Sequence, residues 1–334
     1  QAIKDRSIMQ LYFSVQFFLM LESQVEYKPF LEAFKEKYRI NDWNEYIRSV
    51  FALLAINQYK PTIIPGDLRN DKNHLVNKVV LDKISLPWDD YVKFYSDGPE
   101  DREGNTDYKK FRAKPLIRLK NGDYAFISWE FVVDRLFNSL YFDFKELNVS
   151  KKLLGLFTEK FAEKHLFNHL LEMSVSEKKY HTITENQMEE NCSKATKKIG
   201  ELGPPDYLIQ NDTSCIIFEC KDVRIGGDEL QTHDFDIIID IFSNKLYQKK
   251  WHYKNGVKEY FPIDKDRRIG ITQLTDHIMN IRAGRFKYTN VDSHKRIYPV
   301  LIISDYKNVH KGFSHIANNW YRKSLDKLNA KSEK

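Results

Sequence analysis

The chain has 334 residues, of which 42% are hydrophobic and 30% charged, with 13 Gly and 10 Pro. This is the composition of a globular protein, and it excludes collagen-like, low-complexity and wholly disordered chains. The length fits two domains of ordinary size. The formal net charge of +6 indicates a moderately basic protein.

The cysteines and the apolar runs indicate the compartment. Cys192, Cys215 and Cys220 form no CxxC pair, and an odd number of cysteines does not describe a disulfide framework. The longest apolar-rich run, residues 11–21, contains Ser and Gln and is too short for a membrane-spanning helix, which needs about 20 residues. We therefore expect a cytoplasmic protein without a membrane partner.

Taken in chain order, the first half is predicted to be mainly helical. Helix-period patterns predict three helices, at Ile8–Glu22, Pro29–Tyr38 and Trp43–Gln58, with Asn41 or Asp42 as the N-cap of the third. Residues 60–114 carry many turn formers and charges, and we expect loops and short elements there. A β-hairpin with Asn121-Gly122 at its turn follows, and then a helix over Trp129–Tyr141.

The pattern breaks near residues 145–151, which predicts a mainly helical N-terminal domain over 1–149 and a second domain over 150–334. The second domain alternates between the two kinds of element. Helices are expected at 151–171, 229–250, 272–282 and 310–328, and strands at 180–184, 207–210, 215–221 and 297–304. A helix, three strands, a helix and a strand in this order predict an α/β domain around a mixed sheet.

Positive charge is concentrated in two stretches of the second half. Residues 241–270 hold eight Lys/Arg and three Asp/Glu, and residues 281–296 hold five Lys/Arg and one acid. Aromatic residues such as Tyr247, Trp251 and Tyr253 are interleaved with these charges. Cations that meet phosphates and rings that stack on bases suit a nucleic-acid surface, whereas the alternative is an ordinary solvated face rich in lysine.

The segment 203–222 carries the most informative pattern. Side chains alternate along a strand, so Glu219 and Lys221 share one face at the end of an otherwise apolar strand. Charges are unfavourable there unless they are paired or bind something. Asp206 follows Pro205 at the start of the preceding strand, and a short connection through residues 210–213 would bring it beside Glu219.

Two carboxylates and a lysine at such a place suit one kind of chemistry. Asp206 and Glu219, with the backbone carbonyl of Cys220, offer the hard oxygen ligands that Mg²⁺ prefers, and Mn²⁺ could substitute. A bound metal polarises a phosphate and acidifies a water molecule, and Lys221 could orient that water and stabilise developing charge. The pattern therefore predicts phosphodiester hydrolysis without a covalent intermediate.

Pro205-Asp206 followed by Glu219-Cys220-Lys221 resembles the motif of the PD-(D/E)XK nuclease superfamily. That group includes restriction endonucleases, repair nucleases and effectors of bacterial anti-phage systems. The resemblance covers roughly residues 150–305. It implies a restriction-endonuclease-like sheet flanked by helices, Mg²⁺ as cofactor, DNA as substrate, and an endonuclease role in restriction or anti-phage defence.

The resemblance also implies two supporting groups. The core helix that precedes the strands often supplies another carboxylate, and Glu159 and Glu163 both lie on the inward-tending stripe of the matching helix. The sequence does not decide between them. A later helix often carries a glutamine that faces the site, and Gln273 matches by order and context, although residues 223–268 form an unusually long segment before it.

Several alternatives stay open. His165 and His169 share a helix face and could bind a transition metal, as could the acidic run over 222–240, which could equally be a solvated face or a shield. Cys220 falls on the other strand face, where a small apolar side chain fits better than a catalytic thiol. No P-loop or GxGxxG motif occurs, so an energy-driven step would need a separate ATPase partner.

The substrate and the assembly also stay open. A non-catalytic nucleic-acid-binding or assembly module on the same fold and an RNA-cutting toxin are the competing functions, because nothing in the residues separates DNA from RNA. A homodimer and a regulatory partner are both compatible with the sequence.

Overall fold

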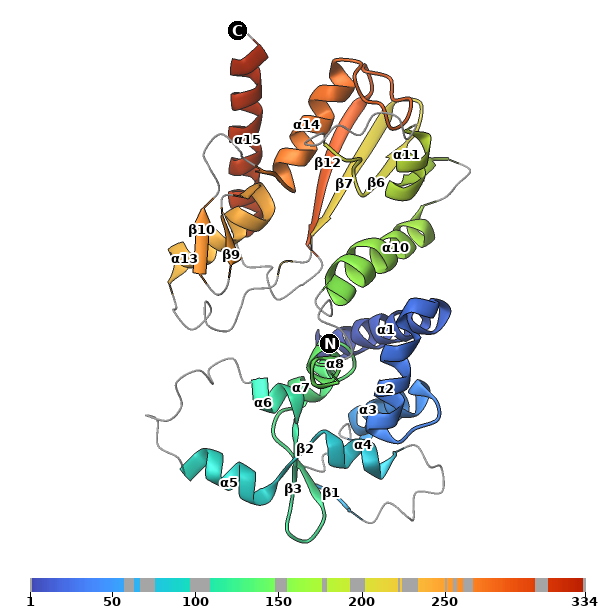
Figure 1. Cartoon of the computed structure of the whole chain (residues 1–334), viewed down its shortest axis with the longest axis vertical. Coiled ribbons are helices and arrows are strands. Elements are labelled where there is room, and N and C mark those ends of the chain that lie inside the picture. The colour runs from blue at the N-terminus through green and yellow to red at the C-terminus, as the bar shows by residue number, and fades with distance from the viewer. Residues whose placement is uncertain are drawn as a thin grey trace. The chain divides into compact units, whose positions relative to one another are not determined.

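The computed structural model describes residues 2–56, 63–66, 76–96, 109–147, 155–175, 179–192, 202–221, 223, 234–249, 251–254, 257–260, 267–303 and 312–332. The chain forms two compact units, Gln1–Phe157 and Thr158–Lys334 (Figure 1). The division falls after the expected boundary at 149/150. Phe157 belongs to the first unit, and its ring stacks on Phe17 with the ring centroids 4.5 Å apart.

The first unit begins with three helices at the predicted places, α1 (Ala2–Ser23), α2 (Lys28–Tyr38) and α3 (Trp43–Ile56), with a short 3₁₀ turn η1 (Val25–Tyr27) after α1. Asp42 caps α3, because its Oδ1 accepts a hydrogen bond from the N–H of Asn44 at 2.9 Å. Arg39 ends α2 in the left-handed conformation, with φ at 51°. Within the described residues, no helix is long and apolar enough to span a membrane.

A small sheet completes this unit, with the order β1 (Ile63–Ile64), β4 (Tyr124–Phe126), β3 (Leu116–Arg118) and β2 (Ser85–Pro87). Strands β3 and β4 form the predicted hairpin. Gly122 at its turn has a φ of 89°, and its N–H donates to the carbonyl of Leu119 at 2.9 Å. A residue with a side chain would be strained in this left-handed conformation, which explains the Asn-Gly turn.

The described residues of the stretch 60–114 form short elements, as expected, among them the helices α4 (Lys78–Lys83), α5 (Trp88–Ser96) and α6 (Lys109–Ala113). Asn77 caps α4 by accepting from the N–H of Val79, so a local signal was present. The helix expected over 129–141 is divided into α7 (Trp129–Asp134) and α8 (Leu140–Glu146), because the N–H of Ser139 turns back to the carbonyl of Asp134 at 2.8 Å.

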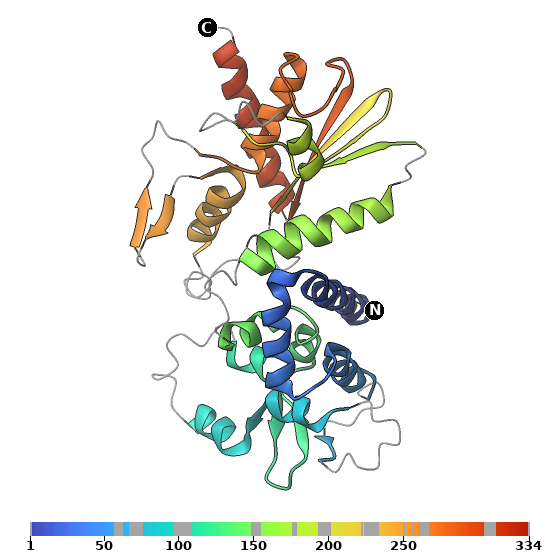
Figure 2. The same ribbon diagram turned by 45° about the vertical axis from the view of Figure 1, so that its right-hand side comes forward.

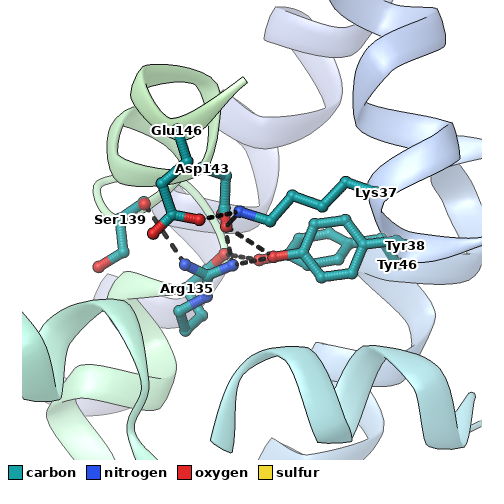
Figure 3. A network of polar contacts seen from close by, with 7 residues as sticks. All are labelled: Lys37, Tyr38, Tyr46, Arg135, Ser139, Asp143 and Glu146. Carbon is teal, nitrogen blue, oxygen red and sulfur yellow. Dashed lines mark hydrogen bonds and ion pairs between the residues drawn. The ribbon is translucent and has the colours of Figure 1, made fainter. Parts of the chain in front are cut away.

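A buried polar network lies between α2, α3, α7 and α8 (Figure 3). Arg135 is fully buried and donates to the carboxylate of Asp143. The hydroxyl of Tyr38 donates to Asp143 at 2.8 Å, and that of Tyr46 donates to the carbonyl of Arg135 at 2.9 Å. Lys37 adds a second cation, 2.8 Å from Asp143. Each buried charge in this network therefore faces an opposite charge.

The second unit is built on a four-stranded mixed sheet with the order β12 (Arg296–Ile303), β7 (Ser214–Lys221), β6 (Tyr207–Gln210) and β5 (His181–Thr184). β12 pairs with β7 in parallel, and the other neighbours are antiparallel. All four strands lie where the sequence predicts them. The second unit is thus an α/β domain with a mixed sheet, as expected.

Helices cover both faces of this sheet (Figures 1 and 2). They are η5 (Leu156–Leu166), which is wound as a π-helix, its continuation α10 (Phe167–Ser174), α11 (Glu185–Asn191), α14 (Ile271–Arg282) and α15 (Phe313–Ser332). Leu274 of α14 packs with Leu208 and Ile217 on one face. Phe167 of α10 packs with Tyr207 and Phe218 on the other, so successive residues of β6 and β7 alternate between two cores.

The long helix expected over 229–250 is also corrected, although residues 224–233 lie outside the described part. The chain forms α13 (Phe235–Phe242), a π-turn η6 (Ser243–Tyr247) and short strands β8 (Gln248–Lys249), β9 (Trp251–Lys254), β10 (Val257–Tyr260) and β11 (Arg267–Arg268). The side chain of Asn244 bonds both the N–H and the carbonyl of Trp251. These bonds return the chain to an extended conformation and end the helix.

Candidate active site

Asp206, Glu219 and Lys221 meet at adjoining ends of β6 and β7. The Nζ of Lys221 lies 2.6 Å from Oε1 of Glu219 and 3.9 Å from Oδ2 of Asp206. The backbone N–H of Cys220 donates to the same Oδ2 of Asp206 at 2.6 Å. The structure therefore brings together the three side chains that the sequence pattern selected.

The backbone holds Asp206 in this place. Its N–H donates to the carbonyl of Phe218 at 3.2 Å, so main chain and side chain both bond to β7 on either side of Glu219. Pro205, buried just before it, has a φ fixed by its ring. Further upstream, the hydroxyl of Tyr288 donates to the carbonyl of Leu202. Asp206 is thus positioned by the fold rather than by its own rotamer alone.

Glu219 is the most unusual group of the site. It is only 1% exposed, and among the described residues its Oε2 has no hydrogen-bond partner. Burial raises the pKa of Glu219 to about 8, although Lys221 opposes this and Asp206 adds to it. A buried acceptor without a partner is unfavourable by roughly 1–3 kcal/mol. Such an oxygen is suited to a ligand.

Lys221 remains a cation in this environment. Burial alone would lower its pKa, but the nearby carboxylates of Glu219, Asp206 and Glu163 outweigh that effect and raise the pKa above its usual value. Lys221 therefore provides a permanent positive charge beside two acidic groups. It can hold a water molecule or stabilise negative charge on a substrate.

The two acids of the preceding helix differ in their surroundings. Glu159 is 53% exposed and lies near Lys160 and Lys164, at 3.4 and 4.0 Å. Glu163 is half-buried and acts electrostatically on both Glu219 and Lys221. These differences favour Glu163 as the helix carboxylate of the site, and its role stays a prediction.

The structure adds one acid that the sequence reasoning missed. Glu185 follows β5 directly, and its N–H donates to the carbonyl of Asp206 at 3.1 Å. Its carboxylate lies 3.3 Å from Lys164. The signal that could have found it is Thr184-x-x-Gln187, a capping-box pattern that marks a helix starting at the end of a strand.

Two other predicted residues have backbone roles. The side-chain carbonyl of Gln273 accepts from the N–H of Gly270 at 2.7 Å, which caps α14. No described contact joins it to Asp206, Glu219 or Lys221, so a role at the site stays a prediction. The Cys220 side chain is buried in the core on the α10 face, and its N–H serves Asp206.

The site contains the type of ligand atom, carboxylate oxygen, that binds hard divalent cations. Carboxylate oxygens from Asp206 and Glu219 are available, and the partnerless Oε2 of Glu219 is of the type that Mg²⁺ binds. Across the described ranges, no three His, Cys, Asp or Glu side chains lie so that they could hold a metal ion together, so binding would require these side chains to move. That statement includes the His165–His169 pair, whose rings stack at 6.4 Å, whereas the acidic run 222–240 lies largely outside the described residues.

Comparison with known proteins adds no relative. No protein-family model matches the chain, and searches of curated proteins and of solved structures return no match. The functional argument therefore depends on the geometry of this site.

Proposed function

We propose that this chain is a Mg²⁺-dependent nuclease that hydrolyses phosphodiester bonds of DNA, as an endonuclease of a restriction or anti-phage system. The observation that carries the proposal is the meeting of Asp206, Glu219 and Lys221 at adjoining strand ends. The Oε2 of Glu219 is buried and has no hydrogen-bond partner in the part of the chain that the structure describes, and a second carboxylate, that of Asp206, lies beside the same lysine. Both features are expected of a site that takes up a cation.

The topology of the second unit supports a restriction-endonuclease-like fold. A helix (η5 and α10) precedes the strands β5, β6 and β7, with the short helix α11 between β5 and β6. After α13 and the short strands β8 to β11, α14 leads to β12 beside β7. The sequence resemblance implies the same order of elements around the PD and ExK motifs. Asp206 lies at the start of the second strand and Glu219 near the end of the third, as that resemblance requires.

Each residue has a defined part in the proposed reaction. Asp206 and Glu219 would hold the metal, assisted by Glu163, and the bound metal would supply Lewis-acid activation of the phosphate and of a water molecule. Lys221, fixed by both carboxylates, orients the attacking water and stabilises charge that develops on the phosphate. The basic stretches 241–270 and 281–296 would contact the DNA backbone.

The first prediction concerns Lys221→Ala. Because Lys221 is the only ammonium group bonded to Glu219 in the described residues, we expect cleavage to fall by about 10²–10⁴-fold while the protein stays folded. The measurement is nicking of supercoiled plasmid with and without Mg²⁺. Lys160→Ala, on the exposed side of η5, is the matched control. Full cleavage by Lys221→Ala would refute its role.

One observation favours a second candidate, a non-catalytic nucleic-acid-binding module. The 2.6 Å contact between Lys221 and Glu219 is also the distance expected of an ion pair that only stabilises the fold. In the same experiment, retardation of DNA without metal-dependent cleavage would favour that function. Cleavage of RNA alone would indicate an RNA-cutting enzyme.

A further inference from the structure

A third strand end contributes to the same place. Glu185 directly follows β5, and its N–H is bonded to the carbonyl of Asp206 at 3.1 Å. Asp206 is in turn bonded to β7 through Phe218 and Cys220. Glu185, Asp206 and Glu219 therefore come from three neighbouring strands at one end of the sheet.

The position of Glu185 is fixed by its helix. Thr184 and Gln187 form a reciprocal capping box, in which the Oε1 of Gln187 accepts from the N–H of Thr184 at 2.9 Å. Glu185 is the first residue of α11, so its backbone has little freedom. Its side chain is 24% exposed. Thr184 pairs with Tyr207 and Tyr207 with Phe218, so Glu185, Asp206 and Glu219 lie at the next position in register across the three strands.

Among the described residues, acidic groups outnumber the cations of this region. Glu163, Glu185, Glu189 and Asp206, joined by Glu219 when it is ionised, interact with the two ammonium groups of Lys164 and Lys221. Lys164 is shared further, since it also lies 4.0 Å from Glu159. An excess of partly buried negative charge is unfavourable unless another cation joins it.

A second feature points to a ligand independently of this charge count. Glu219 is almost fully buried, and its Oε2 has no partner among the described residues although Oε1 is paired with Lys221. A metal ion that binds this oxygen displaces the proton that the carboxyl group holds below about pH 8 and leaves the contact between Oε1 and Lys221 in place. The oxygen available to a metal ion is thus the Oε2 of Glu219.

We propose that Glu185 is a third carboxylate ligand of the divalent cation, and that Lys164 neutralises Glu185 while no cation is bound. This inference rests on the proposed function. On cation binding, the Lys164 ammonium is released from Glu185 and becomes available for a substrate phosphate. The pair is partly exposed, so its separation has a small energetic cost.

The test is a calorimetric titration of the full chain with Mn²⁺ alone, without nucleic acid. Glu185→Gln should raise the Kd for Mn²⁺ at least about tenfold, because a direct ligand is lost. Glu190→Gln removes the same charge from an exposed position of the same helix and should change the Kd less than twofold. Lys164→Met should lower the Kd by up to about fivefold, since the competing ammonium is gone.

The outcomes separate this inference from the proposed function. If Asp206→Asn abolishes Mn²⁺ binding while Glu185→Gln binds as the wild type does, the role of Glu185 is overturned and the nuclease proposal stands. If the wild-type chain binds no Mn²⁺ in the millimolar range, both are overturned. A tighter complex with Lys164→Met cannot result from misfolding, so that variant guards against a general loss of structure.

Discussion

In two regions of this molecule, buried carboxylates lie beside lysine or arginine side chains, and the two regions differ in the ratio of acidic to basic groups. In the first unit, Arg135 and Lys37 face Asp143 and Glu146, two charges against two (Figure 3). At the sheet end of the second unit, the described acidic groups outnumber the two lysines, Lys164 and Lys221, that interact with them. Burial of charge alone therefore does not identify a functional site. An excess of one sign, together with an acceptor that has no partner, is the more specific indication.

The two regions should respond oppositely when a charge is removed. In the balanced network the removal of either charge lowers stability, because the remaining partner is then a buried charge without compensation. In the unbalanced site the removal of one carboxylate relieves repulsion in the cation-free protein. The free energy of unfolding of single variants therefore tests whether the two regions differ in this way.

The largest expected effect is that of Arg135→Met. The variant leaves Asp143 buried beside the Tyr38 hydroxyl without its buried arginine partner, so we expect the free energy of unfolding to fall by about 3–5 kcal/mol. Urea unfolding of the full chain is the measurement. Arg118→Met is the control, because Arg118 is half-exposed and 3.5 Å from Asp82, a pair whose loss should cost about 1 kcal/mol or less. Equal losses would contradict the comparison.

Glu219→Gln should have the opposite sign in metal-free buffer. The pKa of Glu219 is raised from 4.5 to about 8, so between these pH values the folded state retains a proton that the unfolded state has lost. Wild-type stability therefore decreases as pH rises through this window and levels off above pH 8. The wild type should lose roughly 2 kcal/mol more than Glu219→Gln between pH 6 and pH 8.

Chemical unfolding at several pH values, with chelator present, measures this difference. Glu190→Gln, exposed on α11, should keep the wild-type pH dependence. A Glu219→Gln variant that is less stable than the wild type at pH 8 would show that Glu219 belongs to a balanced pair with Lys221, as Asp143 does with Arg135.

Much of the second unit follows from the sequence because its elements carry local signals. Apolar runs with turn residues on both sides predict β6, β7 and β12 within about one residue. Alternation along β7 puts Glu219 and Lys221 on one face, and the short link to β6 brings Asp206 beside them. The meeting of these three side chains could thus be predicted, whereas their chemical roles stay predictions.

Other features depend on contacts that no local pattern encodes. Tyr38 and Asp143 are 105 residues apart in sequence, and nothing in either segment indicates their hydrogen bond. Glu159 and Glu163 are separated only by their exposure and by the lysines near Glu159, which the local sequence does not show. Gln273 matches the expected position of a site glutamine, but its bond to the N–H of Gly270 explains its presence as a helix cap. Local rules therefore give elements and faces, but not long-range partners.

The smallest predicted effect compares two helix caps, one in each unit. Thr184→Ala removes the cap of α11, and Asn77→Ala removes the cap of α4, so each should lower stability by about 1 kcal/mol. Only Thr184→Ala should also weaken Mn²⁺ binding, because the start of α11 positions Glu185 against Asp206. Thr184→Ser, which retains an acceptor oxygen, should restore both properties. Equal Mn²⁺ affinity in the two alanine variants would mean that α11 has a structural role alone.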